Sequence, residues 1–112
     1  MSINNYFDKI YIITMESNKE RHQYIKKLFS ENNIKNYKFV YGIEGKNINV
    51  DELVKNKQLD EEWLEKRPNV IGTILTHRDA WKDMIENNYN QCVFFEDDVY
   101  FLKRFKERFN DF

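Results

Sequence analysis

Short apolar segments alternate with polar stretches along the chain, and three of them predict β-strands. Residues 10–13 form a continuous run of β-forming side chains, which is typical of a strand buried on both faces. Residues 37–41 predict a second strand, and the glycines at 42 and 45 predict a turn after it. Residues 92–95 are apolar throughout, which predicts a third strand in the interior of a parallel sheet.

Apolar residues at helical spacing predict the helices between and after these strands. Ser17 and Glu20 have the spacing of a capping box and open the first helix, whose apolar positions are Tyr24, Ile25, Leu28 and Phe29. A longer helix is expected from about residue 71 to 88, with an apolar stripe formed by Ile71, Ile74, Leu75, Trp81, Met84 and Ile85. Two short helices are expected at residues 50–55 and 60–66, and a last amphipathic helix should carry Phe101, Leu102, Phe105 and Phe109.

The regular alternation of strands and helices predicts an α/β fold. We expect a layered, Rossmann-like arrangement with a mostly parallel sheet and helices on both faces. The composition fits a single domain over residues 1–112, since 41% hydrophobic and 16% aromatic side chains can form a packed core. Ligands of such sheets bind at the carboxyl ends of the strands, where the strand order reverses. If the second and third strands flank the first, the crevice should open between Met15 and Glu96.

Charge and cysteine content narrow the class of protein. The chain has 18 basic and 19 acidic residues, so it lacks the electrostatic footprint of a protein that binds nucleic acid or an anionic membrane. A single cysteine, Cys92, excludes an intramolecular disulfide and fits a reducing compartment. The start of the chain lacks the layout of a signal peptide, and no apolar stretch approaches the roughly 20 residues of a membrane span. We therefore expect a cytoplasmic, globular protein.

Three adjacent carboxylates, Glu96, Asp97 and Asp98, directly follow the third predicted strand. Carboxylates this close repel one another and are costly to desolvate without a cation. Oxygen ligands suit Mg²⁺ or Mn²⁺ bound together with substrate phosphates. Alternation along an extended chain should turn Glu96 and Asp98 to one side and Asp97 to the other. A solvated acidic turn or a helix N-cap would use the same residues, so the triplet alone does not establish a metal site.

The passage from the first strand into the first helix, residues 14–21, is a candidate anion site. Free backbone amides and the helix dipole favour an anion there, and Arg21 adds a bidentate donor suited to phosphate. Arg21 shares a helix face with Ile25 and Leu28, so we expect it to be more than a solvent-facing charge. A structural ion pair is the equal alternative for this residue.

The two histidines differ in their surroundings. His77 follows Thr76 and lies on the side of the long helix that carries Ile74 and Trp81. A lone histidine on an apolar helix face is usually a packed residue with a satisfied hydrogen bond, and that interpretation is favoured before any resemblance is considered. His22 is expected to lie at the surface.

Four segments of the chain resemble, in order and spacing, the motifs of glycosyltransferase family 25, whose members act in lipopolysaccharide assembly and in collagen galactosylation. These segments are residues 12–16 with Arg21, residues 42–45, residues 71–77 leading to Trp81, and residues 94–99. Some positions depart from the family pattern: Thr14 and Glu16 replace Asn and Asp, Glu44 replaces Asp, Val70 replaces Glu, Thr73 replaces Cys, and Thr76 replaces Ser. Because Val70 removes a carboxylate, no role of that acid carries over.

The resemblance implies the nucleotide-sugar-binding half of a GT-A-type glycosyltransferase. Such an enzyme would use a UDP-sugar with Mn²⁺ or Mg²⁺ and transfer the sugar, with inversion, to a hydroxyl of a glycan or a hydroxylated protein. The resemblance implies that Glu96 and Asp98 bind the metal, and that the donor is bound by Thr14, Glu16, Arg21, Glu44, Thr76, His77 and Asp97. His77 is also a candidate catalytic residue, but no carboxylate has a distinctive context for the catalytic base. The acceptor half is expected to be absent, so this chain alone would not complete the transfer.

Two other classes of protein are compatible with the pattern. A non-catalytic domain, derived from a glycosyltransferase, would bind a sugar nucleotide or act as a scaffold with the same fold. A phospho-acceptor signalling domain would also place acidic residues at strand ends. Such a domain normally carries its acidic pair after the first strand, where this chain has Thr14, Met15 and Glu16, so this class ranks below the others.

Overall fold

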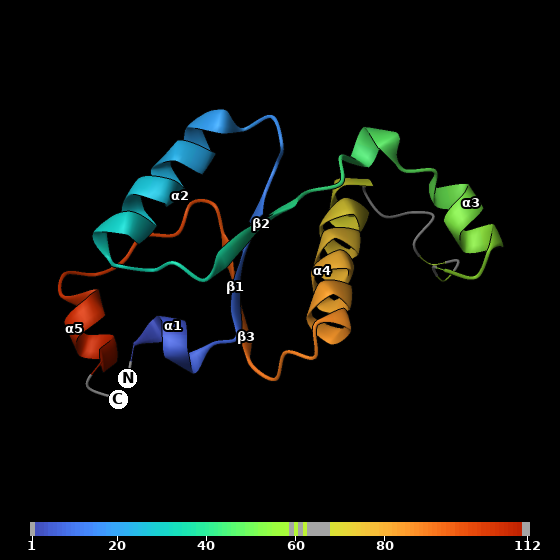
Figure 1. Ribbon diagram of the computed structural model, residues 1–112. Coiled ribbons are helices and arrows are strands. Elements are labelled where there is room, and N and C mark those ends of the chain that lie inside the picture. The colour runs from blue at the N-terminus through green and yellow to red at the C-terminus, as the bar shows by residue number, and fades with distance from the viewer. Residues whose placement is uncertain (1, 59, 61, 63–67, 111–112) are drawn as a thin grey trace.

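The chain forms a three-stranded, fully parallel sheet in the strand order β2-β1-β3. A computed structural model describes residues 2–58, 60, 62 and 68–110. The strands are β1 (Lys9–Thr14), β2 (Tyr37–Tyr41) and β3 (Cys92–Glu96). Figure 1 shows the helix α2 (Lys19–Glu31) on one side of the sheet and the helix α4 (Pro68–Glu86) on the other. The predicted α/β fold with a parallel sheet is confirmed.

The helices fall close to their predicted places. They are α1 (Ile3–Tyr6), α2 (Lys19–Glu31), the 3₁₀ turn η1 (Gly45–Asn47), α3 (Val50–Lys55), α4 (Pro68–Glu86) and α5 (Phe105–Asn110). The first helical turn, α1, was not predicted, and the last helix begins at Phe105, after Phe101 and Leu102 rather than around them. The helix predicted at residues 60–66 lies outside the described residues. None of the described helices is long and apolar enough to pass through a bilayer.

The larger core lies between the sheet and α2. Ile10 and Ile12 of β1 pack there with Ile25 and Phe29 of α2, all fully buried. Aromatic rings from the chain after β3 extend this core, because Phe101 stacks on both Phe29 and Phe105. The alternation of β1 therefore supplies one face to this core and leaves Tyr11 for the opposite face, against α4.

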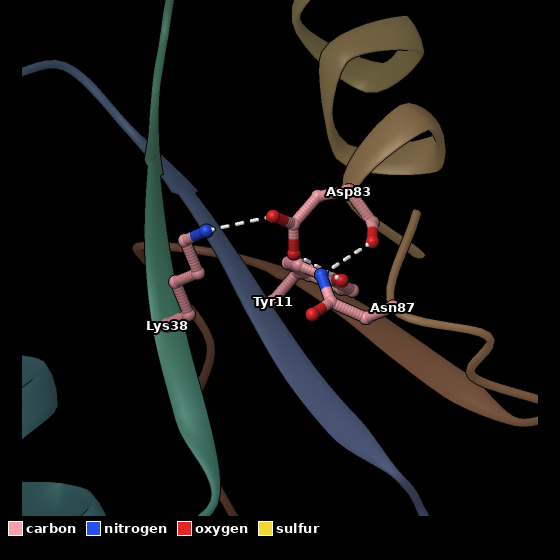
Figure 2. Close-up of polar contacts among 4 residues, drawn as sticks. All are labelled: Tyr11, Lys38, Asp83 and Asn87. Carbon is pink, nitrogen blue, oxygen red and sulfur yellow. Dashed lines mark hydrogen bonds and ion pairs between the residues drawn. The ribbon is translucent and has the colours of Figure 1, made fainter. Parts of the chain in front are cut away.

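A polar cluster fixes α4 on its face of the sheet (Figure 2). The Tyr11 hydroxyl, on a fully buried ring, donates a hydrogen bond to Asp83 Oδ2 at 2.7 Å, and Lys38 of β2 contacts Asp83 Oδ1 at 2.9 Å. The hydrogen bond from Lys38, and then that from Tyr11, hold the pKa of the Asp83 carboxyl below its ordinary value. Burial and the bond to Asp83 raise the pKa of Tyr11, so the hydroxyl remains a donor. This cluster joins both strands to the helix.

Two packing expectations are wrong. The predicted apolar stripe of α4 is divided: Ile71 and Leu75 are buried, whereas Trp81 is 51% exposed and Ile85 is 73% exposed. The third strand, β3, is an edge strand of the described sheet with half-buried side chains, and β1 is the strand with a neighbour on each side. A continuous apolar run indicates contact on two faces, but it does not give the number of strands alongside.

Candidate functional site

Three connections meet at the carboxyl end of the sheet. β1 continues into the turn before α2, β2 into the loop before η1, and β3 into the acidic turn. The strands are in register here, because Thr14 pairs with Tyr41 and Ile13 pairs with Glu96. Since β2 and β3 lie on opposite sides of β1, the strand order reverses at β1. This reversal is the condition under which a binding site was predicted at the carboxyl end of the sheet.

A glycine brings the loop after β2 against the end of β1. Gly42 donates its backbone N–H to the Thr14 carbonyl at 2.7 Å. A Cβ atom at Gly42 would lie 2.5 Å from Met15 Sδ, so a larger residue would displace the methionine. The loop after β2 and the end of β1 are therefore in direct contact.

Two adjoining cavities open beside this contact. The smaller, of about 440 Å³, is lined by Ile13, Met15, Gly42, Ile43, Glu44, Lys46, Thr73 and Thr76. The larger, of about 620 Å³, shares five of those residues and adds Glu16, Ser17, Lys19 and Asn47. The hollow thus lies between the ends of β1 and β2, with α4 contributing Thr73 and Thr76. Met15 lines both cavities and Glu96 lines neither, so these two cavities lie on the β2 side of β1, and a crevice between Met15 and Glu96 stays a prediction.

Charged side chains of both signs surround the larger cavity. Glu16 and Glu44, both predicted to bind the donor, lie in its wall, and Lys46 contacts Glu44 at 3.1 Å. Lys19, in the first turn of α2, adds a second cation, which was not predicted from the sequence. Arg21 is exposed and forms no ion pair within the described residues, so the alternative of a structural ion pair is not observed there, and its role at the donor stays a prediction.

Thr76 and Gly72 hold the loop after β2 against α4. The Thr76 hydroxyl, 1% exposed as a residue, accepts the backbone N–H of Ile43 at 3.0 Å and donates to the Gly72 carbonyl at 2.7 Å. A Cβ atom at Gly72 would collide with the carbonyl oxygen of Ile43. The hydroxyl hydrogen of Thr76 is therefore already used inside the protein, although its side chain borders the smaller cavity.

One of the two histidines departs from its expected place, and the other is packed beside aromatic rings. His22 is only 5% exposed, stacks on Phe39 and Tyr41, and its ring Nε2 lies 2.9 Å from the Met15 carbonyl, to which it donates. The expectation of a surface residue is wrong, because position 22 shares the sheet-facing side of α2 with Ile25 and Phe29. His77 is half-buried, with its ring 6.2 Å from those of Trp81 and Phe94, and lines neither cavity.

The acidic residues form a turn whose members face different surroundings. Glu96 and Asp98 are exposed, whereas Asp97 is half-buried and accepts a hydrogen bond from Thr14 Oγ1 at 2.7 Å. The sequence predicted this division between the neighbouring carboxylates. Two exposed oxygen donors suit Mg²⁺ or Mn²⁺. The described residues contain no group of three or more His, Cys, Asp or Glu that could hold a metal, so further ligands would come from a phosphate or water.

Comparison with known protein families matches residues 7–112 to glycosyltransferase family 25, described as a lipopolysaccharide biosynthesis protein. The chain belongs to glycosyltransferase family 25. Among curated proteins, it is 30% identical over 112 residues to procollagen galactosyltransferase 2 of Homo sapiens and 31% identical over 109 residues to procollagen galactosyltransferase 1-A of Xenopus laevis. Each match covers 91% of this chain but only 17% or 18% of the relative. This family 25 chain thus corresponds to a small part of those proteins.

Proposed function

We propose that this family 25 chain is the donor-binding part of a glycosyltransferase that uses a UDP-sugar. The observation that carries the proposal is the pair of cavities at the carboxyl end of a parallel sheet whose order reverses at β1. Lys19 and Lys46 provide positive charge for a diphosphate in the larger cavity. Glu16 and Glu44 provide acceptors for the hydroxyls of a ribose or a sugar.

The exposed carboxylates of the acidic turn are the proposed metal ligands. Glu96 and Asp98 would hold Mn²⁺ or Mg²⁺ across the end of β1 from the cavities. A divalent ion supplies compensation for the charge that develops on a diphosphate leaving group. The diphosphate would then lie between the metal on the acidic turn and the lysines of the larger cavity, with its ribose or sugar hydroxyls near Glu16 and Glu44.

The proposed reaction is transfer with inversion. An acceptor hydroxyl forms a bond to the anomeric carbon as the bond to the diphosphate breaks, and a base takes the hydroxyl proton. The described residues do not identify that base, and His77 lies outside both cavities. We propose a glycan or a hydroxylated protein as the acceptor, and the names of the relatives make a galactose donor the first to test.

Calorimetric titration of UDP and UDP-galactose, with and without Mn²⁺, tests the proposal. We expect metal-dependent binding that Asp98→Asn weakens about tenfold or more, equivalent to about 1.4 kcal/mol. Asp79→Asn is the matched control, because Asp79 is exposed on α4 and lines neither cavity. Wild-type protein that fails to bind UDP with Mn²⁺, or an Asp98→Asn variant that binds as the wild type does, would overturn the proposal. Hydrolysis of the bound donor by this chain would count against the non-catalytic alternative.

A further inference from the structure

We propose that Thr14 and Tyr24 are positioning residues, whose hydroxyls hold the acidic turn in the conformation that binds the metal and the donor. The inference rests on the proposed function and changes the role of Thr14, which the family resemblance places among the donor-binding residues. Both hydroxyls act on the turn through hydrogen bonds from distant parts of the chain. The turn itself is residues 96–99, closed by a bond from the Val99 amide to the Glu96 carbonyl at 3.2 Å.

Thr14 fixes the middle of the acidic turn. Its residue is 3% exposed at the end of β1, and its hydroxyl donates to Asp97 Oδ2 at 2.7 Å. A hydroxyl has one hydrogen to donate, and a diphosphate accepts hydrogen bonds without donating any. While Thr14 is bonded to Asp97, it therefore has no donor left for the nucleotide. Thr14 can serve the donor through Asp97 and the turn, but not by direct contact with phosphate.

Tyr24 fixes the end of the same turn from α2. Its hydroxyl donates to the Val99 carbonyl at 2.6 Å, although the residue is partly open to solvent. Together, Thr14 and Tyr24 connect the turn to β1 and to α2. Glu96 and Asp98 remain exposed between these two attachments.

The attachments matter because the turn carries three neighbouring negative charges. No cation forms a salt bridge to Glu96, Asp97 or Asp98 within the described part of the chain. An unrestrained segment would separate such charges, and bringing them together again would oppose metal binding. Neutral hydroxyl donors hold the turn while leaving the carboxylate charges uncancelled. The arrangement is therefore preorganised for a cation.

Removal of single hydroxyl groups tests this inference. Thr14→Val keeps the shape of the side chain without its donor, Thr14→Ser keeps the donor, and Tyr24→Phe removes only the second hydroxyl. We expect Thr14→Val and Tyr24→Phe to weaken Mn²⁺-dependent UDP binding on the order of tenfold, as is typical for residues that orient metal ligands. Thr14→Ser should remain within about twofold of the wild type, and Thr14→Val should add no loss in an Asp97→Ala background.

The controls separate positioning from a loss of folding. Tyr6→Phe should bind as the wild type does, since the Tyr6 ring packs against Phe7 and Phe109 and contacts none of the described residues 96–99 through a hydrogen bond. Circular dichroism establishes whether each variant is folded. If Thr14→Val does not fold, Tyr24→Phe still tests the inference. Folded Thr14→Val and Tyr24→Phe variants with wild-type affinity would overturn the positioning roles and leave the proposed function intact. A wild-type chain that does not bind UDP with Mn²⁺ would instead remove the proposed function, and the inference with it.

Discussion

Asp83 shows how a single side chain can join three elements. It accepts hydrogen bonds from Tyr11 on β1 and Lys38 on β2, while its own backbone belongs to α4. Near the end of the helix, Asn87 donates to the Asp83 carbonyl at 2.7 Å. Because Tyr11 is fully buried, loss of the carboxylate would leave a phenol without its charged acceptor.

The effect of Asp83→Asn on stability should depend on pH. A carboxyl whose pKa is lower in the folded state contributes stability that is complete above its unfolded pKa of about 3.9. This contribution disappears as the pH falls through the folded pKa. We expect Asp83→Asn to lower the free energy of unfolding by about 1–3 kcal/mol at pH 7, with a difference from wild type that shrinks at pH 3. Urea denaturation at several pH values measures it, with Asp79→Asn as the control. A difference that is unchanged at pH 3 would contradict this account.

The separate residues of the site were only partly predictable. The division between exposed Asp98 and half-buried Asp97 followed from the alternation of a strand. The helical spacing of His22 from Ile25 and Phe29 indicated that it would be buried, but histidine was expected at the surface because it is polar. The bond from Tyr11 to Asp83 had no local signal, because its partners are 72 positions apart.

At the scale of elements, α4 depends on close approach to the loop after β2. Thr76 holds the Ile43 amide, and Gly72 leaves room for the Ile43 carbonyl. This contact places α4 beside the smaller cavity, which Thr73 and Thr76 of the helix help to line, and Ile43 borders both cavities. The apolar periodicity of α4 predicted a helix, but not which residue would touch the loop.

The Gly72→Ala variant should show whether the contact with Ile43 outweighs the higher helix propensity of alanine. In an unconstrained helix, alanine would be favoured over glycine by about 1 kcal/mol. Here the added methyl group would collide with the Ile43 carbonyl, a backbone atom that cannot rotate aside. We expect a loss of about 1–3 kcal/mol, measured by thermal or urea unfolding. Lys82→Ala, at an exposed position of the same helix, is the control and should change the stability little. A Gly72→Ala variant that is more stable than the wild type would contradict the close contact with Ile43.

The strands could be predicted better than their surroundings. All three were found from local apolar runs, and each lies within a residue or two of its predicted place. The edge position of β3 and the exposure of Trp81 could not be predicted in the same way. Both depend on which other parts of a fold lie alongside, and local periodicity carries no information about that.

At the scale of the whole molecule, β1 organises the fold. It lies between the two other strands and contributes residues to the cores on both faces of the sheet. β3 contributes Phe94, which stacks on Tyr11 at 5.1 Å, and Phe95, which contacts Phe29. The sheet would therefore lose packing on both faces if β3 were removed.

A chain that ends at Gln91 should not fold cooperatively. Fully burying one large apolar side chain is worth about 1.5–3 kcal/mol, and several are lost with β3 and the segment after it. That loss is comparable with the total stability of a small domain, about 5–15 kcal/mol. Circular dichroism with urea denaturation should show no sharp transition for the shortened chain beside the full-length protein. A cooperative transition near that of the full chain would show that β3 is dispensable.

The binding edge was predicted from topology, but the two cavities on the β2 side of β1 were not. The strand order gave the edge, because carboxyl ends of parallel strands meet there. The position of the cavities depends instead on Gly42 and Ile43, which shape the loop after β2. The bond between Thr14 and Asp97 spans the side that had been expected to open.

The parallel pairing also sets the order in which the protein can assemble during translation. Ile10 pairs with Tyr37, and on its other side with Val93, which is synthesised 83 positions after Ile10. One edge of β1 therefore has no neighbouring strand until almost the whole described chain has left the ribosome. Exposed edges and apolar faces of this kind favour aggregation and chaperone binding. The acidic turn directly follows β3 and is synthesised at the same late stage, so a nascent chain gains its candidate metal ligands last.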